Sequence, residues 1–313
     1  MTHASSLILL GPQRKSPRVR EALDRLGSSK PVALIAAGWE EREPEHAELE
    51  QHLGQTVLNL EPYRRGEEVL AGDRELFDAM QERHDELRSI QDRYRLRLAH
   101  ALAASRELFA LGSEDPNTAD DLEGSLEAVR VLDDSHLTRV AEVHARFEER
   151  YKLAGRPLIR RHRRELLALL AKTEVVCVAG GHVAILVNRM RMFGLSDMLS
   201  GRPLIAWAAG AMALSERVVL FHDSPPQGAG DAEVFDSGFG FARDIVCLPH
   251  ASERLQLDDA SRVSLMARRF APALCVTLDP PSKLAQTDTG WEERGPSQRL
   301  LENGTLKRME AAC

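Results

Sequence analysis

Short, continuously apolar runs separated by amphipathic helical segments constrain this chain more than any other feature. Three such runs, Leu7–Leu10, Pro31–Gly38 and Thr56–Leu60, alternate with helical patterns over residues 17–26 and 40–53. A strand that is apolar on both faces is typical of a parallel sheet covered by helices on both sides. The first 66 residues therefore predict a doubly wound, mostly parallel α/β sheet.

The alternation stops near Arg65 and resumes near Leu158. The intervening residues, 67–157, are highly charged, contain few prolines and glycines, and place apolar side chains at 3-4 spacing in two long stretches. A loop signal, Gly112–Asn117, separates the two stretches. We therefore expect a long antiparallel helical hairpin at 67–157, inserted into one α/β domain made of residues 1–66 and 158–313.

The α/β pattern then continues to the end of the chain. Helices are expected at 158–171, 183–193 and 259–270, and strands at 175–178, 203–207, 217–221, 245–248 and 273–278. The doubly wound arrangement therefore applies to both halves of the divided domain.

Composition argues against several classes of function. The formal net charge is −7, so nucleic-acid binding is not expected. The arginine-rich segment 160–164 is interpreted as solvated helix turns, with a phosphate or nucleic-acid patch as the alternative. No apolar run approaches the roughly 18 residues of a membrane helix, and residues 1–10 do not resemble a signal peptide. We expect a cytoplasmic protein that does not bind membranes.

Cysteine and histidine spacing gives no sign of a metal or other cofactor. The four cysteines lack C-x-x-C spacing, and three of them lie in apolar runs where buried free thiols are expected. His222-Asp223 has no matching second pair, so neither a metal site nor a cofactor is predicted.

The segment 203–211, Pro-Leu-Ile-Ala-Trp-Ala-Ala-Gly-Ala, is the most informative for function. An apolar strand runs directly into small residues, with Ala206 and Gly210 flanking Ala208 at positions −2 and +2. That spacing is required by a nucleophile elbow, whose tight strand-to-helix turn leaves no room for larger side chains. A close strand–helix packing turn is the alternative. Either way, the central position carries a methyl group.

The surrounding residues resemble the S51 peptidase family, which includes dipeptidase E and cyanophycinase and has a class I glutamine-amidotransferase-like fold. The family's Gly-Trp-Ser-Ala-Gly-Ala elbow corresponds to 206–211, and its Gly-Gly turn to Gly180-Gly181. Its Pro-His pair corresponds to Pro249-His250, and its C-terminal loop to 278–284. The resemblance covers residues 1–65 loosely and 158–313 in consistent order, but not the helical insertion.

The resemblance implies a role for each matching residue. Ala208 occupies the nucleophile position, and His250 would be the general base. The family's glutamate falls on Pro280, so Asp279 or Asp223 would have to orient the histidine, with Asp279 preferred.

The remaining matches concern the oxyanion hole and the ligand. The backbone amides of Gly181 and Ala209 would form the oxyanion hole, and Gly180, His182 and Trp207 would complete the ligand-binding surface. His182-Val183 departs from the polar pair that the family prefers.

Two functions follow from the missing nucleophile. The chain is either a non-catalytic S51-like protein that keeps a pocket for a peptide or amino-acid-like ligand, or a serine peptidase or amidohydrolase whose serine has been replaced by Ala208. Loss of the nucleophile from such a triad costs about 10⁶ in turnover.

The hairpin is expected to mediate a homodimer, because apolar positions such as Leu102, Leu108 and Phe109 need a covering surface. A lid over the protein's own pocket is the competing interpretation.

Overall fold

The computed structural model describes residues 7–112, 115–221, 230–287, 290–293 and 295–309. Its largest sheet has seven strands in the order β11-β10-β1-β5-β4-β2-β3, of which the last five are mutually parallel. The parallel strands are β1 (Leu7–Leu10), β5 (Leu204–Trp207), β4 (Val176–Val178), β2 (Val32–Ile35) and β3 (Val57–Asn59). The antiparallel edge is formed by β10 (Lys283–Thr287) and β11 (Gly290–Glu293).

Helices cover both faces of this sheet because its central strands are apolar on both sides. Along β1, Leu7 and Leu9 join one hydrophobic cluster, whereas Ile8 and Leu10 join another. The smaller cluster packs under α1 (Val19–Leu26) and α2 (Ala47–Leu53). The larger one includes residues of α3 (Pro62–Gly72), α6 (Pro157–Leu170), α7 (Val183–Met192), α8 (Leu195–Leu199) and α9 (Ala209–Leu214). The expected mixed α/β architecture with a mostly parallel sheet is therefore present.

The C-terminal strands do not extend the central sheet. They form a four-stranded sheet of β8 (Ile245–Pro249), β9 (Leu274–Leu278), β12 (Gln298–Leu300) and β13 (Leu306–Arg308), in which β8 and β9 are parallel. Two short helices, α10 (Ala251–Arg254) and α11 (Ala260–Phe270), belong to the same part of the chain. A separate antiparallel pair joins β6 (Arg217–Leu220) to β7 (Glu233–Ser237). The sequence patterns gave no indication of β7, β10 or β11.

The segment expected to form one helix at 40–53 is interrupted. A 3-10 stretch spans Ala37–Arg42, and α2 begins only at Ala47. Pro44 separates the two, as expected for a residue that lacks a backbone N–H and restricts the residue before it. Gly38, at the start of the 3-10 stretch just after β2, lies at the carboxyl edge of the sheet beside the Gly180-Gly181 turn.

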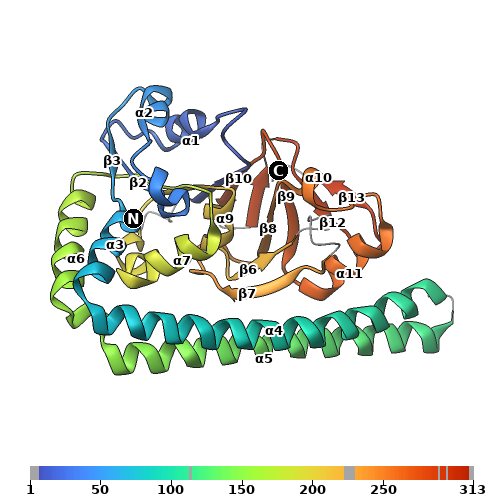
Figure 1. The fold of residues 1–313 in the computed structure, drawn as a ribbon. Coiled ribbons are helices and arrows are strands. Elements are labelled where there is room, and N and C mark those ends of the chain that lie inside the picture. Colours follow the sequence, from blue (N-terminus) through green and yellow to red (C-terminus); the bar gives the residue numbers. More distant parts are fainter. Residues whose placement is uncertain (1–6, 113–114, 222–229, 288–289, 294, 310–313) are drawn as a thin grey trace.

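The expected helical hairpin is present as α4 (Arg74–Leu111) and α5 (Pro116–Tyr151), with 38 and 36 residues. At 1.5 Å per residue each helix is roughly 55 Å long, and Figure 1 shows the pair running beside the α/β body and past α11. The Asp73 and Asp115 side chains accept backbone N–H groups at the two N-termini. Residues 67–72 continue α3, so the separate pair of long helices begins at Arg74.

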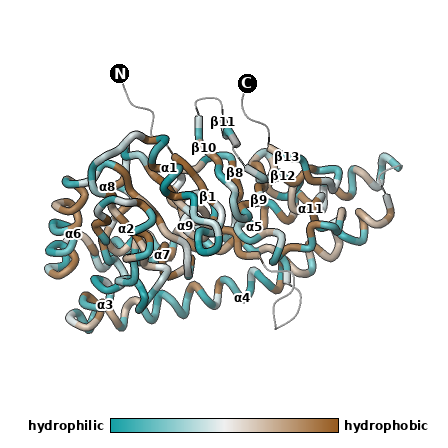
Figure 2. The backbone as a smooth tube through the Cα atoms, turned by 90° about the horizontal axis from the view of Figure 1, so that it is seen from above, coloured by the Kyte–Doolittle hydropathy of each residue, from teal (hydrophilic) through white to brown (hydrophobic). Residues whose placement is uncertain are grey.

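The hairpin packs against its own chain over much of its length. Leu102 is buried in the larger core cluster, and Leu108 and Phe109 pack with Leu122, Leu126 and Leu265 of α11. Leu102 is thus covered without a second subunit, whereas Leu108 and Phe109 stay half-buried, and the homodimer remains a prediction. Figure 2 shows hydrophilic positions recurring along both long helices, whereas β1 is apolar. Among the described residues, no helix is both long and apolar enough to cross a membrane.

Candidate functional site

The chain makes a strained turn at Ala208, between β5 and α9. Ala208 has φ 49° and ψ −121°, and its carbonyl oxygen accepts hydrogen bonds from the backbone amides of Ala211 and Met212. A positive φ with this ψ is unfavourable for any residue with a Cβ, costing on the order of 1–3 kcal/mol. The tight strand-to-helix turn expected at Ala208 is therefore present, and surrounding contacts must hold it in place.

Two glycines make room for the turn. A Cβ added to Gly210 would lie 2.2 Å from the carbonyl oxygen of Val178, at the end of neighbouring strand β4. A Cβ on Gly180 would lie 2.9 Å from the Ala208 Cβ. Gly210 and Gly180 are therefore both required to be glycine because the ends of β4 and β5 approach each other closely here.

Gly181 approaches the loop after β2 equally closely. It has φ 110°, and an added Cβ would lie 2.1 Å from the carbonyl oxygen of Gly38. That same carbonyl oxygen accepts the backbone N–H of His182 at 2.7 Å. The carboxyl ends of β2, β4 and β5 are thus locked together by backbone contacts, at the sheet edge where ligands bind in open α/β folds.

A cavity of about 770 Å³ opens over this edge. Ala208 and His250 both line it, together with Gly181, Ala209 and Val183. Its volume lies within the range of about 300–1,000 Å³ typical of small-molecule sites. The remaining lining residues come from α4, α9, the β6–β7 region and the segment after β8: Arg95, Met212, Leu220, Phe221, Gly230, Asp231, Glu233, Pro249 and Arg254.

His250 is positioned by the end of β8. It directly follows Pro249, adopts φ 58° and precedes α10, so that β8 and its left-handed turn bring the ring to the cavity. The His250 Nδ1 atom lies 3.3 Å from Oε2 of Glu253, one helical turn further on. Glu253 was not recognised from the sequence, although its i+3 spacing from a histidine at a helix start could have suggested it.

The two acids expected to orient the histidine are Asp279 and Asp223. Both carboxylate oxygens of Asp279 accept the Ser252 backbone N–H, each at 3.2 Å. Within the described part of the chain, no hydrogen bond joins Asp279 to His250. Asp223 lies outside the described residues. Among described carboxylates, Glu253 is therefore the one that contacts the ring.

Of the residues expected to form the oxyanion hole and the ligand-binding surface, two line the cavity and three do not. Gly181 and Ala209 both line the cavity, on either side of Ala208. Gly180 packs against the elbow, because a Cβ added to it would lie only 2.9 Å from the Ala208 Cβ. The exposed His182 is the N-cap of α7, accepting the Ile185 amide at 3.3 Å. The buried Trp207 side chain packs in the cluster under α1 and α2, on the opposite face of the sheet.

Three buried residues with nucleophilic side chains, Cys177, Cys247 and Ser215, do not replace the missing serine. Burial raises the pKa of the Cys177 and Cys247 thiols to about 12, so neither supplies a thiolate near neutral pH. Ser215 is fully buried and donates to the Ala211 carbonyl and the Cys247 sulfur. All three residues serve the core.

Some of the described charged residues in and beside the cavity form ion pairs with each other, and one arginine does not. Arg95 donates to Glu233 at 2.7 Å, and Arg106 forms an ion pair with Asp231. Gln91 also donates to Glu233, at 2.9 Å. Among the described residues, Arg254 has no carboxylate partner. It is therefore the cavity cation available for a ligand.

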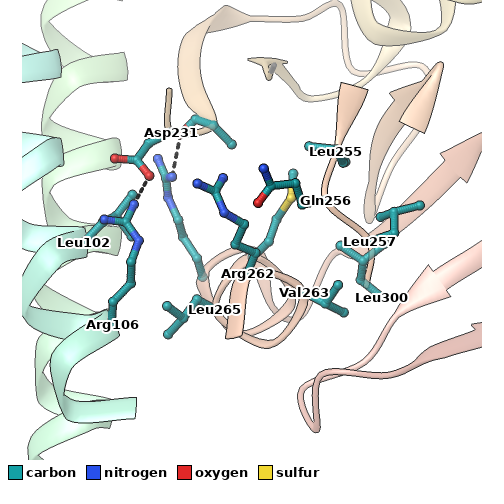
Figure 3. A pocket seen from close by; sticks show the side chains of 13 residues that line it. Leu102, Arg106, Asp231, Leu255, Gln256, Leu257, Arg262, Val263, Leu265 and Leu300 are labelled. Atoms are coloured by element: carbon teal, nitrogen blue, oxygen red, sulfur yellow. Dashed lines mark hydrogen bonds and ion pairs between the residues drawn. The ribbon is translucent and has the colours of Figure 1, made fainter. Parts of the chain in front are cut away.

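A second, much smaller cavity of about 60 Å³ lies between α4 and α11. Figure 3 shows Arg106 of α4 reaching Asp231, with Leu255, Leu257 and Leu300 on the other side. Asp231 lines both cavities. This one contains neither Ala208 nor His250, so it is separate from the elbow.

The described residues contain no group of three or more His, Cys, Asp and Glu side chains placed to hold a metal ion. Comparison with known proteins finds no matching family model and no matching curated protein.

Proposed function

We propose that this chain is a non-catalytic ligand-binding protein built on a serine-hydrolase-like site. The observation that carries the proposal is Ala208 itself: the residue has the backbone geometry of an elbow nucleophile and faces a cavity shared with His250. A methyl group can neither attack a carbonyl nor lose a proton. What the site retains is a shaped pocket with backbone amides, a histidine and an arginine.

The ligand class follows from the lining of the pocket. Met212, Leu220 and Phe221 offer apolar contact, and Arg254 offers a guanidinium that can bind a carboxylate with paired N–H groups. A peptide or amino-acid-like ligand combines these two properties. Its carboxylate would lie at Arg254, and a carbonyl oxygen near the amides of Gly181 and Ala209.

Calorimetric titration of the protein with a panel of dipeptides and single amino acids tests this proposal. We expect saturable binding of at least one member, and recovery of that ligand chemically unchanged. Arg254→Gln should weaken the binding about ten- to hundredfold, the usual range for losing a hydrogen bond to a charged group. Arg160→Gln, an exposed arginine of α6, is the matched control. If no member binds at millimolar concentration, the proposed function is wrong.

The alternative is a serine peptidase or amidohydrolase in which alanine has replaced the serine. Retention of the strained angles at Ala208 favours it, because that strain serves an exposed nucleophile. Ala208→Ser tests it directly. We expect weak hydrolysis at most, since the described carboxylate at His250 is the 65% exposed Glu253. Robust turnover of dipeptides by Ala208→Ser would establish the alternative and refute a purely binding role.

A further inference from the structure

A small hollow between α4 and α5 is lined by several positively charged side chains. Three arginines line it, Arg93 and Arg97 from α4 and Arg139 from α5, together with Ser135. Each helix contributes positions four residues apart, so the side chains of each pair lie one above the other on the same face. Tyr94 and Leu132 provide its apolar part. The hollow shares no residue with the cavity at Ala208.

These three arginines differ from many other arginines of the protein in having no acidic partner among the described residues. Arg93 donates to the Ser89 hydroxyl at 2.6 Å. Within the part of the chain that the structure describes, none of the three forms an ion pair. Arg95, between them in sequence, pairs with both Glu233 and Asp92. Like charges four residues apart on a helix are destabilising, so an anion bound here would relieve their repulsion.

His136 supplies an independent sign that the hollow holds a ligand. Its side chain lines the hollow, is only 3% exposed, and stacks on Tyr94 with ring centroids 4.1 Å apart. Among the described residues neither ring nitrogen makes a hydrogen bond of normal geometry, although the Phe235 backbone lies close enough to act on the ring as a weak hydrogen-bond acceptor. Buried polar groups without partners are rare because each costs about 1–3 kcal/mol. A ligand that accepts a hydrogen bond would satisfy this ring.

The groups around His136 act on its charge in opposite directions. Burial is the largest influence and lowers its pKa, and the nearby Arg139 lowers it further. The Phe235 backbone and the carboxylates of Asp133 and Asp236 oppose that change. An anion in the hollow would act with the carboxylates and raise the pKa of the ring.

We propose that this hollow, formed by Arg93, Arg97, Arg139, Ser135 and His136, binds a phosphate group. Guanidinium groups pair with phosphate oxygens through two parallel N–H donors, and the hydroxyl and imidazole add further donors. The hollow itself has a volume of about 10 Å³, room for little more than a single oxygen atom. The ligand must therefore be compact, with its other oxygens at the surface among the arginines. Inorganic phosphate and a small phosphate monoester share this chemistry.

Calorimetric titration of the whole protein at low ionic strength tests the site. Inorganic phosphate is one titrant and O-phosphoserine the other, and tighter binding of one identifies the source of the group. We expect the double variant Arg97→Gln/Arg139→Gln to weaken binding of either by at least about tenfold. The control Arg14→Gln/Arg243→Gln removes the same charge from two exposed positions outside the hairpin. Absent binding, or equal weakening in both double variants, would overturn the proposal.

Histidine-selected NMR provides a second readout that nonspecific charge effects would not produce. The His136 ring resonances, assigned by their loss in His136→Gln, should shift on adding phosphate, and their pKa should rise. In Arg97→Gln/Arg139→Gln the same shift should need at least about tenfold more phosphate. Ring resonances that do not respond in the unaltered protein would refute the contact with His136.

Discussion

The elbow region and the interface between the hairpin and the α/β body are held together in contrasting ways. At the elbow, backbone meets backbone: Gly180, Gly181 and Gly210 allow strand ends to approach where any Cβ would collide. At the hairpin interface, buried charged side chains meet. Arg269 of α11 donates two hydrogen bonds to Asp133 of α5, and their side chains are only 2% and 0% exposed. The Tyr94 hydroxyl of α4 joins the same network, because it donates to Asp133 and accepts from Arg269.

A second charged cluster fastens the hairpin to β7. Arg191 of α7 forms an ion pair with Asp236, and the His144 ring of α5 lies 3.2 Å from the same carboxylate. These hydrogen bonds and charges lower the Asp236 pKa against the effect of burial. The contrast shows that close packing of small residues specifies a local turn, whereas buried charges specify which distant elements meet, because each must find its partner.

Removing one charge from the hairpin interface should have the largest effect. Asp133→Ala leaves Arg269 buried without its counter-ion, and loss of one partner of a buried pair typically costs about 3–5 kcal/mol. Urea denaturation would measure the free energy of unfolding. Glu86→Ala, which breaks the exposed pair with Arg146, should cost less than about 1 kcal/mol. Similar losses in the two variants would mean that the buried network does not hold the hairpin.

Adding one methyl group at the elbow should have the next largest effect. In Gly210→Ala the new Cβ would meet the Val178 carbonyl oxygen at 2.2 Å, and relief of such overpacking typically costs about 1–3 kcal/mol. Gly124→Ala in α5 is the matched control, because its Cβ would meet nothing within 4 Å. It should raise stability by up to about 1 kcal/mol through better helix propensity. A neutral Gly210→Ala would show that the elbow is loosely packed.

A smaller effect concerns Glu43, which breaks the simple contrast because it is a buried carboxylate near the elbow edge. It accepts the backbone amides of Tyr63 and Arg64 at the start of α3, at 3.0 and 2.9 Å. Burial raises its pKa from 4.5 to about 7. The folded state therefore binds more protons than the unfolded state between these values, and the free energy of unfolding should fall as pH rises through this window.

Glu43→Gln should flatten that dependence, by an amount on the order of 2–3 kcal/mol between pH 5 and 8. Urea denaturation of both proteins at the two pH values gives the difference in slope, which cancels the contribution of other titrating groups. Parallel pH profiles would indicate that Glu43 titrates normally in the folded protein.

A feature could be predicted from the sequence when the residues that determine it lie close together along the chain. The strained turn at Ala208 follows from residues two positions away on either side, so it could be located without any structure. The long helices could be recognised from 3-4 spacing for the same reason. Strand β7 could not, because its residues Glu233 and Asp236 are polar and pair with arginines on α4 and α7.

By itself the sequence determined the apolar parallel strands, the hairpin insertion and the alanine at the head of the elbow, since each is encoded in residues that are neighbours along the chain. Only the tertiary structure decided that Asp279 binds the Ser252 amide, that Trp207 faces away from the cavity, and that three arginines gather beside the buried His136. The physical reason is that side-chain direction and ionic pairing are fixed by packing among residues far apart in sequence, which spacing alone does not record.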